Sequence, residues 1–290
     1  MKRDYSAFCD GGASWTEEYV ALPTGVGLRS VTFTPAVASS APPVIFIPGM
    51  GSIIENFRET LIELTRNHTV FYIETREKAS ARISRKNKFS VEDITADIIH
   101  YARHKFPGDE RYVMAGYSLG ATAIAEAFGH LENKPERIIL IEPNSSFPFH
   151  GLLVLLSRAA RVVYRPLKPL LKWYLRRFRI NLREDPEMYH INCRILDSAE
   201  PVRLGAAVRH LAPYCMDGCL QKISVPALVV VASNDRFHSH DGGTDIARRI
   251  ANADYLDMVD NKRTHSAGMG RVIDEFISSP AQIPAPSGQL

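Results

Sequence analysis

Hydrophobic positions along the chain fall into two patterns, short apolar runs and longer amphipathic stretches. The short runs are rich in β-branched and aromatic residues, which predicts strands at 15–22, 28–34, 44–47, 69–73, 112–115, 137–141, 225–232 and 254–259. Apolar residues at helical spacing predict helices at 53–66, 90–106, 118–128, 246–250 and 266–278. The alternation of strand and helix predicts an α/β fold, a mostly parallel central sheet with helices on both faces.

The pattern changes after Glu142, where the next 75 or so residues show no buried strand. Helical stretches there are interrupted by prolines, which remove a backbone donor and break or kink helices. These prolines are Pro166, Pro169, Pro186, Pro201 and Pro213. We therefore expect a helical insertion within the sheet-forming part of the chain.

The stretch Gly116-Tyr117-Ser118-Leu119-Gly120 matches G-x-S-x-G and lies between an apolar run and a helical one. A tight strand-to-helix turn forces its central serine into a strained backbone, and side chains two residues away on either side would clash. Glycine at 116 and 120 removes that clash. The serine hydroxyl would then stand at a helix N-terminus, which favours developing negative charge.

On this motif and the strand–helix alternation, the chain resembles the α/β-hydrolase superfamily over about residues 15–278, apart from the insertion. The resemblance implies a core of residues 1–145 and 221–279 and a helical cap of residues 146–220. It also implies that the first two strands pair antiparallel. Residues 280–290 are predicted to form a disordered tail, because the stretch contains Pro, Ser and Gly and shows no strand or helix pattern.

The resemblance further implies a catalytic triad, because a serine hydroxyl needs a base and the base needs an orienting acid. The superfamily order is Ser, acid, His. Asp235 follows the run that ends at Ala232, and His265 lies just before the last helix. Ser118 is therefore the expected nucleophile, His265 the general base and Asp235 the acid that orients it.

The loop after the third strand, Pro48-Gly49-Met50-Gly51, is where the superfamily supplies part of an oxyanion hole. Its usual His-Gly is Pro48-Gly49 here. Since both donors are backbone N–H groups, Met50 and Leu119 are the expected pair.

Two alternatives stay open among the site residues. Glu142 ends the strand before the insertion, where some members of the superfamily place their acid. His238 and His240, with Asp235 and Asp241, could bind a metal, since imidazole and carboxylate are zinc ligands. A second ligand cluster is absent from the sequence, so we expect no metal and no cofactor.

Composition is that of an ordinary soluble globular protein, with 45% hydrophobic and 23% charged residues. No run approaches the roughly 20 apolar residues of a membrane span, and no signal peptide is expected. The four cysteines (Cys9, Cys193, Cys215 and Cys219) are few and irregularly spaced. That pattern favours reduced thiols in the cytoplasm, and pairing of Cys215 with Cys219 is the alternative.

Charge is uneven along the chain, because residues 146–220 carry 12 Lys+Arg against 6 Asp+Glu while the whole chain is +3. Basic residues recur at helical spacing from Arg158 to Lys172, beside an apolar side that would line an acyl pocket. The loop after the fourth strand adds Arg76, Lys78, Arg82, Arg85, Lys86 and Lys88. These basic residues could simply form solvated surfaces. The alternative is an anionic partner: an acyl-carrier protein, a CoA thioester or an anionic membrane surface. Nucleic acid is not expected, since no binding motif is present.

Three functions follow from the sequence. The first is a serine hydrolase that cleaves a carboxylic ester or thioester of a small-molecule acyl substrate through an acyl-enzyme, with a hydrophobic acyl group on an anionic carrier as one possibility. The second keeps the same residues for acyl transfer, C–C bond hydrolysis or a lyase reaction. The third is a non-catalytic binding protein, since fold alone does not fix function.

Overall fold

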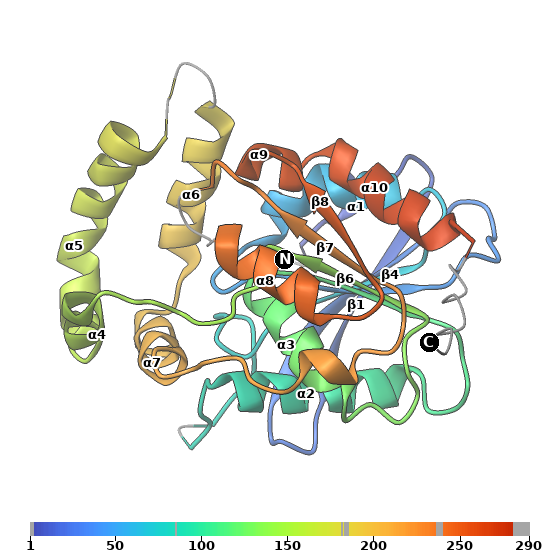
Figure 1. Ribbon diagram of the computed structural model, residues 1–290. Helices are drawn as coiled ribbons and strands as arrows, with labels where there is room; N and C mark the ends of the chain where they lie inside the picture. The colour runs from blue at the N-terminus through green and yellow to red at the C-terminus, as the bar shows by residue number, and fades with distance from the viewer. Residues whose placement is uncertain (1–2, 85, 181, 183–185, 236–239, 281–290) are drawn as a thin grey trace.

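The computed structural model describes residues 3–84, 86–180, 182, 186–235 and 240–280. They form a central sheet with helices on both faces, and a group of helices projects beyond one end of the sheet (Figure 1). The predicted tail lies outside the described residues except for Pro280.

The sheet has eight strands in the order β1-β2-β4-β3-β5-β6-β7-β8. The first two strands pair antiparallel, β2 also pairs antiparallel with β4, and all other neighbours are parallel. The predicted α/β class and the antiparallel opening pair are confirmed. The strands are β1 (Ser14–Ala21), β2 (Gly27–Thr34), β3 (Val44–Ile47), β4 (Val70–Ile73), β5 (Val113–Tyr117), β6 (Arg137–Ile141), β7 (Ala227–Val231) and β8 (Ala253–Asp257).

Helices cover the two faces in separate groups, as Figure 1 shows. One face carries α2 (Val91–Lys105), α3 (Leu119–Phe128) and α8 (His240–Arg249), and the other carries α1 (Arg58–Leu64) and α10 (Ala267–Ser278). Strand residues alternate between these faces: Ile45 and Ile47 belong to the first core, Val44 and Phe46 to the second. The inner parallel strands β3, β5, β6 and β7 are therefore buried on both sides, whereas the edge strand β8 is partly exposed.

Short elements complete the core. The predicted helix at 53–66 begins instead as a 3₁₀ turn, η2 (Ile54–Phe57), and continues as α1. The short helix α9 (Asn261–Thr264) was not predicted. The other 3₁₀ turns are η1 (Ser6–Phe8) and η4 (Leu220–Lys222).

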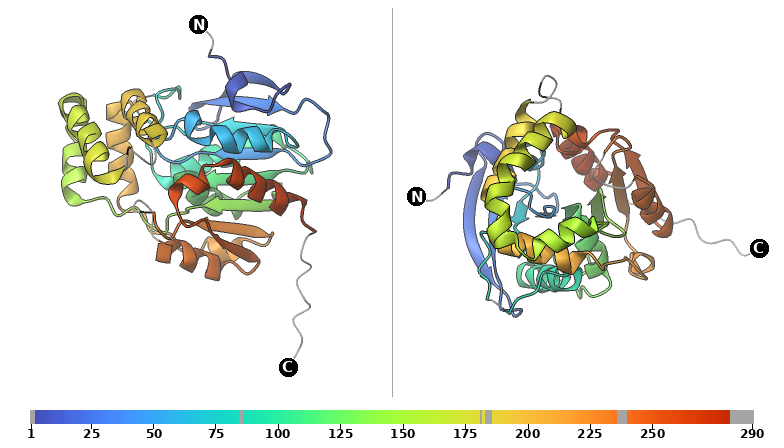
Figure 2. Two further views of the ribbon diagram at one scale, coloured as in Figure 1. Left: turned by 90° about the horizontal axis from the view of Figure 1, so that it is seen from above. Right: turned by 90° about the vertical axis from the view of Figure 1, so that its left-hand side faces the viewer.

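The insertion between β6 and β7 consists of helices, as expected, and lies over the carboxyl ends of the parallel strands (Figure 2). Its elements are α4 (Gly151–Ser157), α5 (Ala160–Tyr174), the π-helical turn η3 (Leu175–Arg179), α6 (Pro186–Ser198) and α7 (Pro201–Leu211). Two of the prolines, Pro186 and Pro201, begin helices, where a proline costs no hydrogen bond.

The prediction that Pro166 and Pro169 break the basic helix is wrong, because α5 runs through both. Both prolines lie on exposed positions, so carbonyl groups that lose their helical donor can be hydrated. The interruption falls earlier, at Ala159, which leaves helical geometry between α4 and α5.

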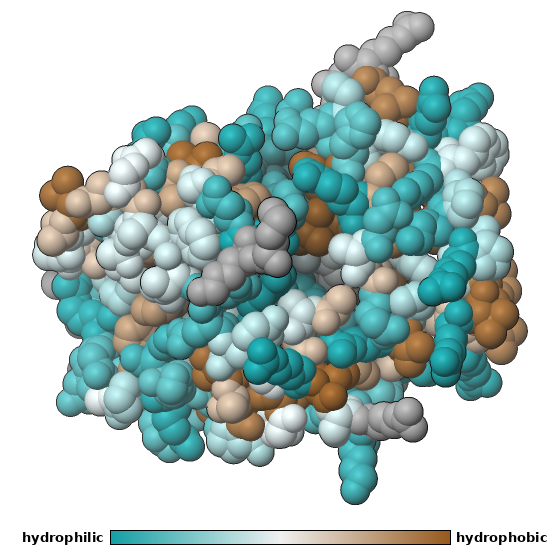
Figure 3. Space-filling model, turned by 180° about the vertical axis from the view of Figure 1, so that it is seen from behind, coloured by the Kyte–Doolittle hydropathy of each residue, from teal (hydrophilic) through white to brown (hydrophobic). Residues whose placement is uncertain are grey.

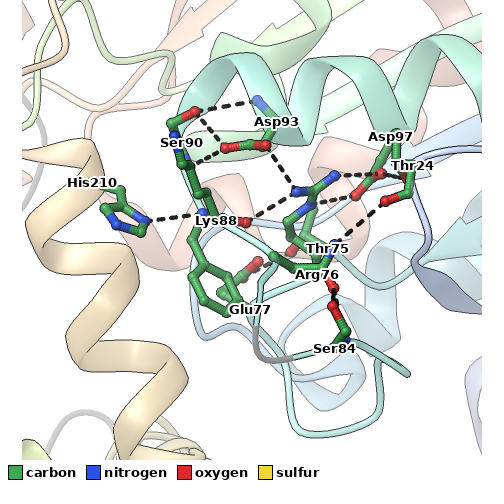
Figure 4. Close-up of polar contacts among 12 residues, drawn as sticks. Thr24, Thr75, Arg76, Glu77, Ser84, Lys88, Ser90, Asp93, Asp97 and His210 are labelled. Atoms are coloured by element: carbon green, nitrogen blue, oxygen red, sulfur yellow. Dashed lines mark hydrogen bonds and ion pairs between the residues drawn. The ribbon is translucent and has the colours of Figure 1, made fainter.

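The basic loop after β4 is partly internal, which corrects the expectation of a wholly basic surface there. Arg76 is 2% exposed, and its guanidinium donates to both carboxylate oxygens of Asp97 at 2.7 Å. It also lies 3.2 Å from Asp93 of α2, as Figure 4 shows. Lys78 is buried as well. These two cations hold the fold together and offer no charge to a partner.

The N-terminus of α2 has the predicted cap, in which Ser90 and Asp93 bond reciprocally to each other's backbone N–H groups. Among the described helices, none is long and apolar enough to cross a bilayer. None of the four cysteines, all within the described residues, forms a disulfide; Cys9 and Cys219 are buried, and Cys215 is exposed.

Candidate active site

Ser118 occupies the turn between β5 and α3 with φ of 53° and ψ of −114°. This is a conformation that non-glycine residues rarely adopt, and such strain concentrates at functional sites. The Ser118 N–H donates to the carbonyl of Ile141 at 2.8 Å, which ties the turn to the end of β6. The strained serine therefore lies at the carboxyl edge of the sheet, where open α/β sheets bind ligands.

Both glycines of the motif are required by close approach of the backbone. A Cβ at Gly120 would lie 2.2 Å from the carbonyl oxygen of Ile47 at the end of β3. A Cβ at Gly116 would lie 2.7 Å from the backbone nitrogen of Ala121. The sequence predicted that a tight turn requires glycine at both positions. The structure adds a second reason at Gly120, where the end of β3 packs against α3.

The turn after β3 lies against the serine, because a Cβ at Gly49 would be 3.1 Å from the Ser118 Cβ. Among the described residues, the N–H groups of Met50 and Leu119 have no hydrogen-bond acceptor. Leu119 is the first residue of α3, whose opening N–H groups have no partner within the helix. Two backbone donors thus flank the serine, as an oxyanion hole needs.

Lys78 holds the turn that carries Met50. Its ammonium donates to the carbonyl oxygens of Gly49 and Ser52, each at 2.9 Å. Burial lowers the pKa of Lys78, while the Glu77 carboxylate 3.8 Å away acts in the opposite direction. This lysine was expected at the surface, and its role at the turn was missed because the contact joins segments 26 and 29 residues apart.

His265 follows α9 and packs beside the serine turn. Its ring centroid lies 4.4 Å from that of Tyr117 and 5.3 Å from that of Phe57. Its Nδ1 lies 2.9 Å from the carbonyl oxygen of Asn261. A carbonyl can only accept, so in the neutral imidazole this contact places the proton on Nδ1 and leaves Nε2 with the lone pair that a general base uses.

Asp235 and Glu142, the two candidate acids, converge on one side chain, that of Asn261. The Asn261 amide nitrogen lies 3.3 Å from Asp235 Oδ2 and 3.2 Å from Glu142 Oε2. It also lies 2.7 Å from the Tyr117 hydroxyl oxygen. Through Asn261, whose carbonyl contacts the imidazole, the described contacts connect both carboxylates to His265. The choice of Asp235 as acid stays a prediction.

Glu142 occupies an unusual position for a carboxylate. It is 2% exposed, has φ of 49°, and accepts a hydrogen bond from the Tyr117 hydroxyl. Burial, and next the charge of Glu142, raise the pKa of Tyr117 well above its ordinary value. Tyr117 therefore remains a neutral donor, and it fixes the carboxylate beside the serine turn.

Asn144 is a site residue that sequence reasoning missed. Its amide donates to the Ser118 hydroxyl oxygen at 3.0 Å. Reciprocal bonds to the Thr122 hydroxyl, 2.9 Å from the Asn144 N–H and 3.1 Å from its carbonyl, hold it in place. A serine oxygen that accepts one bond can still donate its own hydrogen to a base. Its position two residues after Glu142, at the carboxyl edge, was the available signal.

The alternative metal cluster is only partly described. His240 contacts the Tyr255 hydroxyl at 3.0 Å and lies 3.6 Å from Asp241. His238 lies outside the described residues.

A pocket of about 100 Å³ opens beside the turn after β3, residues 48–52, which we call the oxyanion turn. Segments 51–53, 74–80 and 198–204 line it, so it lies between the core and the insertion. The apolar side of α4 and α5 does not enclose it: Leu152 and Leu155 are each 58% exposed. The expectation that this side lines an acyl pocket stays a prediction.

No family model and no curated protein matches the sequence. Solved structures do match the fold. A hydrolase from Pseudomonas aeruginosa PA01 has a TM-score of 0.76 at 16% identity, covering 91% of this chain and 99% of its own. The enol-lactonase from Burkholderia xenovorans LB400 has a TM-score of 0.74 at 17% identity, covering 90% and 100%. A thermophilic esterase from Thermogutta terrifontis has a TM-score of 0.73 at 17% identity, covering 90% and 98%.

The chain has the α/β-hydrolase fold. At these identities the likeness establishes the architecture, and the chemistry has to be argued from the site itself.

Proposed function

We propose that the protein is a serine hydrolase that cleaves a carboxylic ester or thioester through an acyl-enzyme on Ser118. The observation that carries the proposal is the strained Ser118 turn with the N–H groups of Leu119 and Met50 beside it. A serine strained in this way and placed against two backbone donors suits attack on a carbonyl carbon. The esterase and enol-lactonase with the same fold support ester chemistry.

In the proposed reaction, His265 Nε2 takes the hydroxyl proton as Ser118 Oγ bonds to the carbonyl carbon. The negative charge on the carbonyl oxygen is stabilised by the N–H groups of Met50 and Leu119. His265 then gives the proton to the leaving alcohol or thiol, and the C–O or C–S bond breaks. Water, deprotonated by the same imidazole, releases the carboxylic acid and restores Ser118.

Asp235 is the proposed acid that stabilises the imidazolium, with Glu142 as the alternative. Both contact Asn261, so substituting them separately distinguishes them. Loss of the acid should lower kcat by about 10⁴-fold, as the comparable substitution does in serine proteases, whereas a purely structural carboxylate changes kcat little. Asp235→Asn and Glu142→Gln, both near-isosteric, are the variants to compare.

The functional test is turnover of a panel that spans short esters, long esters and acyl thioesters. Ser118→Ala should lower kcat by about 10⁴-fold or more for any true substrate. Ser278→Ala, an exposed serine at the end of α10, is the matched control and should be unchanged. Retention of near-normal turnover by Ser118→Ala would refute the assignment. Added alcohol or thiol acceptors separate hydrolysis from acyl transfer by the product formed.

A further inference from the structure

The helical insertion exposes an unusual combination of side chains on its outer side. Residues 151–180 contain eight basic residues and no acidic residue. In the same segment Val162 is 76% exposed and Trp173 is 54% exposed. Soluble surfaces rarely gather large apolar side chains, and such gatherings mark interaction sites.

Two parallel stripes run along α5. Val162, Pro166, Pro169 and Trp173 form an apolar stripe at spacings of three and four, and every member is exposed. Arg161, Arg165, Lys168 and Lys172 form a basic stripe one residue behind it. At about 100° per residue, each stripe stays on one side of the helix and the two lie next to each other.

The apolar stripe points away from the rest of the protein. The Tyr164 hydroxyl donates to the carbonyl of Leu196 in α6 at 2.7 Å, and Lys172 pairs with Asp197 of α6. These contacts identify the side of α5 that packs on α6. By helix geometry Val162 and Trp173 lie roughly opposite Tyr164, about 160° to 180° around the axis.

The exposed surface continues beyond α5. Leu152 and Leu155 extend it along α4. Tyr174, the last residue of α5, and Phe178 of η3 extend it at the other end, with ring centroids 5.5 Å apart. The right-hand view of Figure 2 looks onto this side, with α4 and α5 towards the viewer. In Figure 3 apolar residues appear along the edge formed by these helices, among polar ones.

Much of the positive charge on this surface is not neutralised within the protein. Lys168 and Lys172 share Asp197. Within the described part of the chain, Arg158, Arg161, Arg165, Arg176 and Arg177 have no ion pair. Their charge is available to an external anion.

We propose that the surface formed by α4, α5 and η3 docks on an anionic phospholipid bilayer. Helices that lie in the plane of a membrane combine Leu, Val, Trp and Phe on one side with Arg and Lys beside them. Trp and Tyr favour the headgroup level, and each Arg near an anionic leaflet adds attraction. An acidic carrier protein would use the arginines but gives no reason to expose Val162 and the leucines of α4.

Docking on this surface would place the insertion, which lies over the carboxyl edge of the sheet, against the lipid. The proposal itself does not depend on catalysis. Ser118→Ala should therefore bind vesicles as the unmodified protein does, which separates failure of the docking proposal from failure of the hydrolase proposal.

The experiment is co-sedimentation of the full chain with vesicles of phosphatidylcholine, with and without phosphatidylglycerol. We expect binding that requires phosphatidylglycerol and weakens as added salt shortens the Debye length from about 10 Å to about 3 Å. Arg161→Gln with Arg165→Gln should lower the partition coefficient about 30-fold. Arg103→Gln with Arg111→Gln, the same charge change at exposed arginines that pair with glutamates elsewhere, is the control.

The apolar contribution has its own matched pair. Val162→Ser should weaken binding, whereas Val37→Ser, also 76% exposed but in the loop between β2 and β3, should not. In a Trp15→Phe background, fluorescence of Trp173 should shift to shorter wavelength and be quenched by brominated lipid. Equal binding to neutral vesicles, an unchanged Trp173 spectrum, or binding of an acyl-carrier protein without binding of vesicles would overturn the proposal.

Discussion

Lys78 offers a sharp test of how the oxyanion turn is held. The perturbation is Lys78→Met, which keeps most of the side-chain volume and removes the ammonium. The variant would lose two hydrogen bonds of 2.9 Å, to the carbonyl oxygens of Gly49 and Ser52 on either side of Met50. The lysine is buried, so no water would readily replace it.

The expected effect follows from what Met50 contributes. A single oxyanion donor is worth about 10²- to 10³-fold in kcat. In the variant the Met50 N–H is still present but its direction is no longer fixed, so we expect kcat to fall about 10- to 100-fold. KM should change little, because the donor acts on charge that develops in the transition state. Stability should fall by about 1–3 kcal/mol, the usual cost of leaving buried carbonyls without a donor.

Steady-state kinetics on the best ester of the panel and urea unfolding measure the two effects. Lys105→Met is the matched control. Lys105, the last residue of α2, pairs with Glu18 of β1, so the same substitution removes a bonded ammonium that does not contact the turn at Met50. Unchanged kcat in Lys78→Met, or an equal fall in the control, would refute the account of the turn.

Three further predictions concern the framework of the site. Gly120→Ala should abolish activity and lower stability by at least about 1–3 kcal/mol, because its Cβ would lie 2.2 Å from the Ile47 carbonyl oxygen; thermal melts and turnover check both effects. Arg76→Met should lower the free energy of unfolding by about 3–5 kcal/mol, because it leaves the buried Asp97 charge without a partner. Adding Asp97→Leu should restore most of the lost stability. Equal urea midpoints for the single and double variants would contradict this. Burial, and next the charge of Arg209, lower the pKa of His210. The unfolded chain therefore binds a proton at higher pH than the folded chain does, so the free energy of unfolding should fall as pH drops below about 6.5. Urea midpoints between pH 7 and pH 5.5 should fall less in His210→Gln; an equal fall would count against the argument.

The His210 prediction rests on a contact between the insertion and the core. The imidazole Nδ1 accepts a hydrogen bond from the Phe89 N–H at 3.0 Å, as Figure 4 shows for the labelled His210. A protonated imidazole cannot accept that bond. The bond joins α7 to the loop before α2, so its loss should loosen the insertion first.

Most of the fold could be predicted from the local periodicity of apolar residues in the sequence. The strands β3 and β6 have the predicted bounds, because short apolar runs are typical of strands covered on both faces; in β6 the first residue, Arg137, is the exception. The serine turn was predictable for a similar reason, since its glycines and its strand–helix context are adjacent in sequence.

Features that depend on distant partners were not predictable. Arg76 and Lys78 appear in the sequence as members of a basic loop, and only their contacts with Asp97 and with the turn at Gly49 show that they are internal. Pro166 and Pro169 appear to end a helix, but exposure of their side of α5 lets the helix continue. Asn261 carries no motif, and its place between the acids and the imidazole depends on four elements meeting.

The central claim, that Ser118 is an activated nucleophile, is tested most directly by mapping the adduct of a serine-directed phosphonate by mass spectrometry of the intact protein and its peptides. We predict one adduct per chain, on the peptide that contains Ser118, and strongly slowed labelling in His265→Gln. An adduct on another residue, or no adduct on the folded protein, would contradict the account.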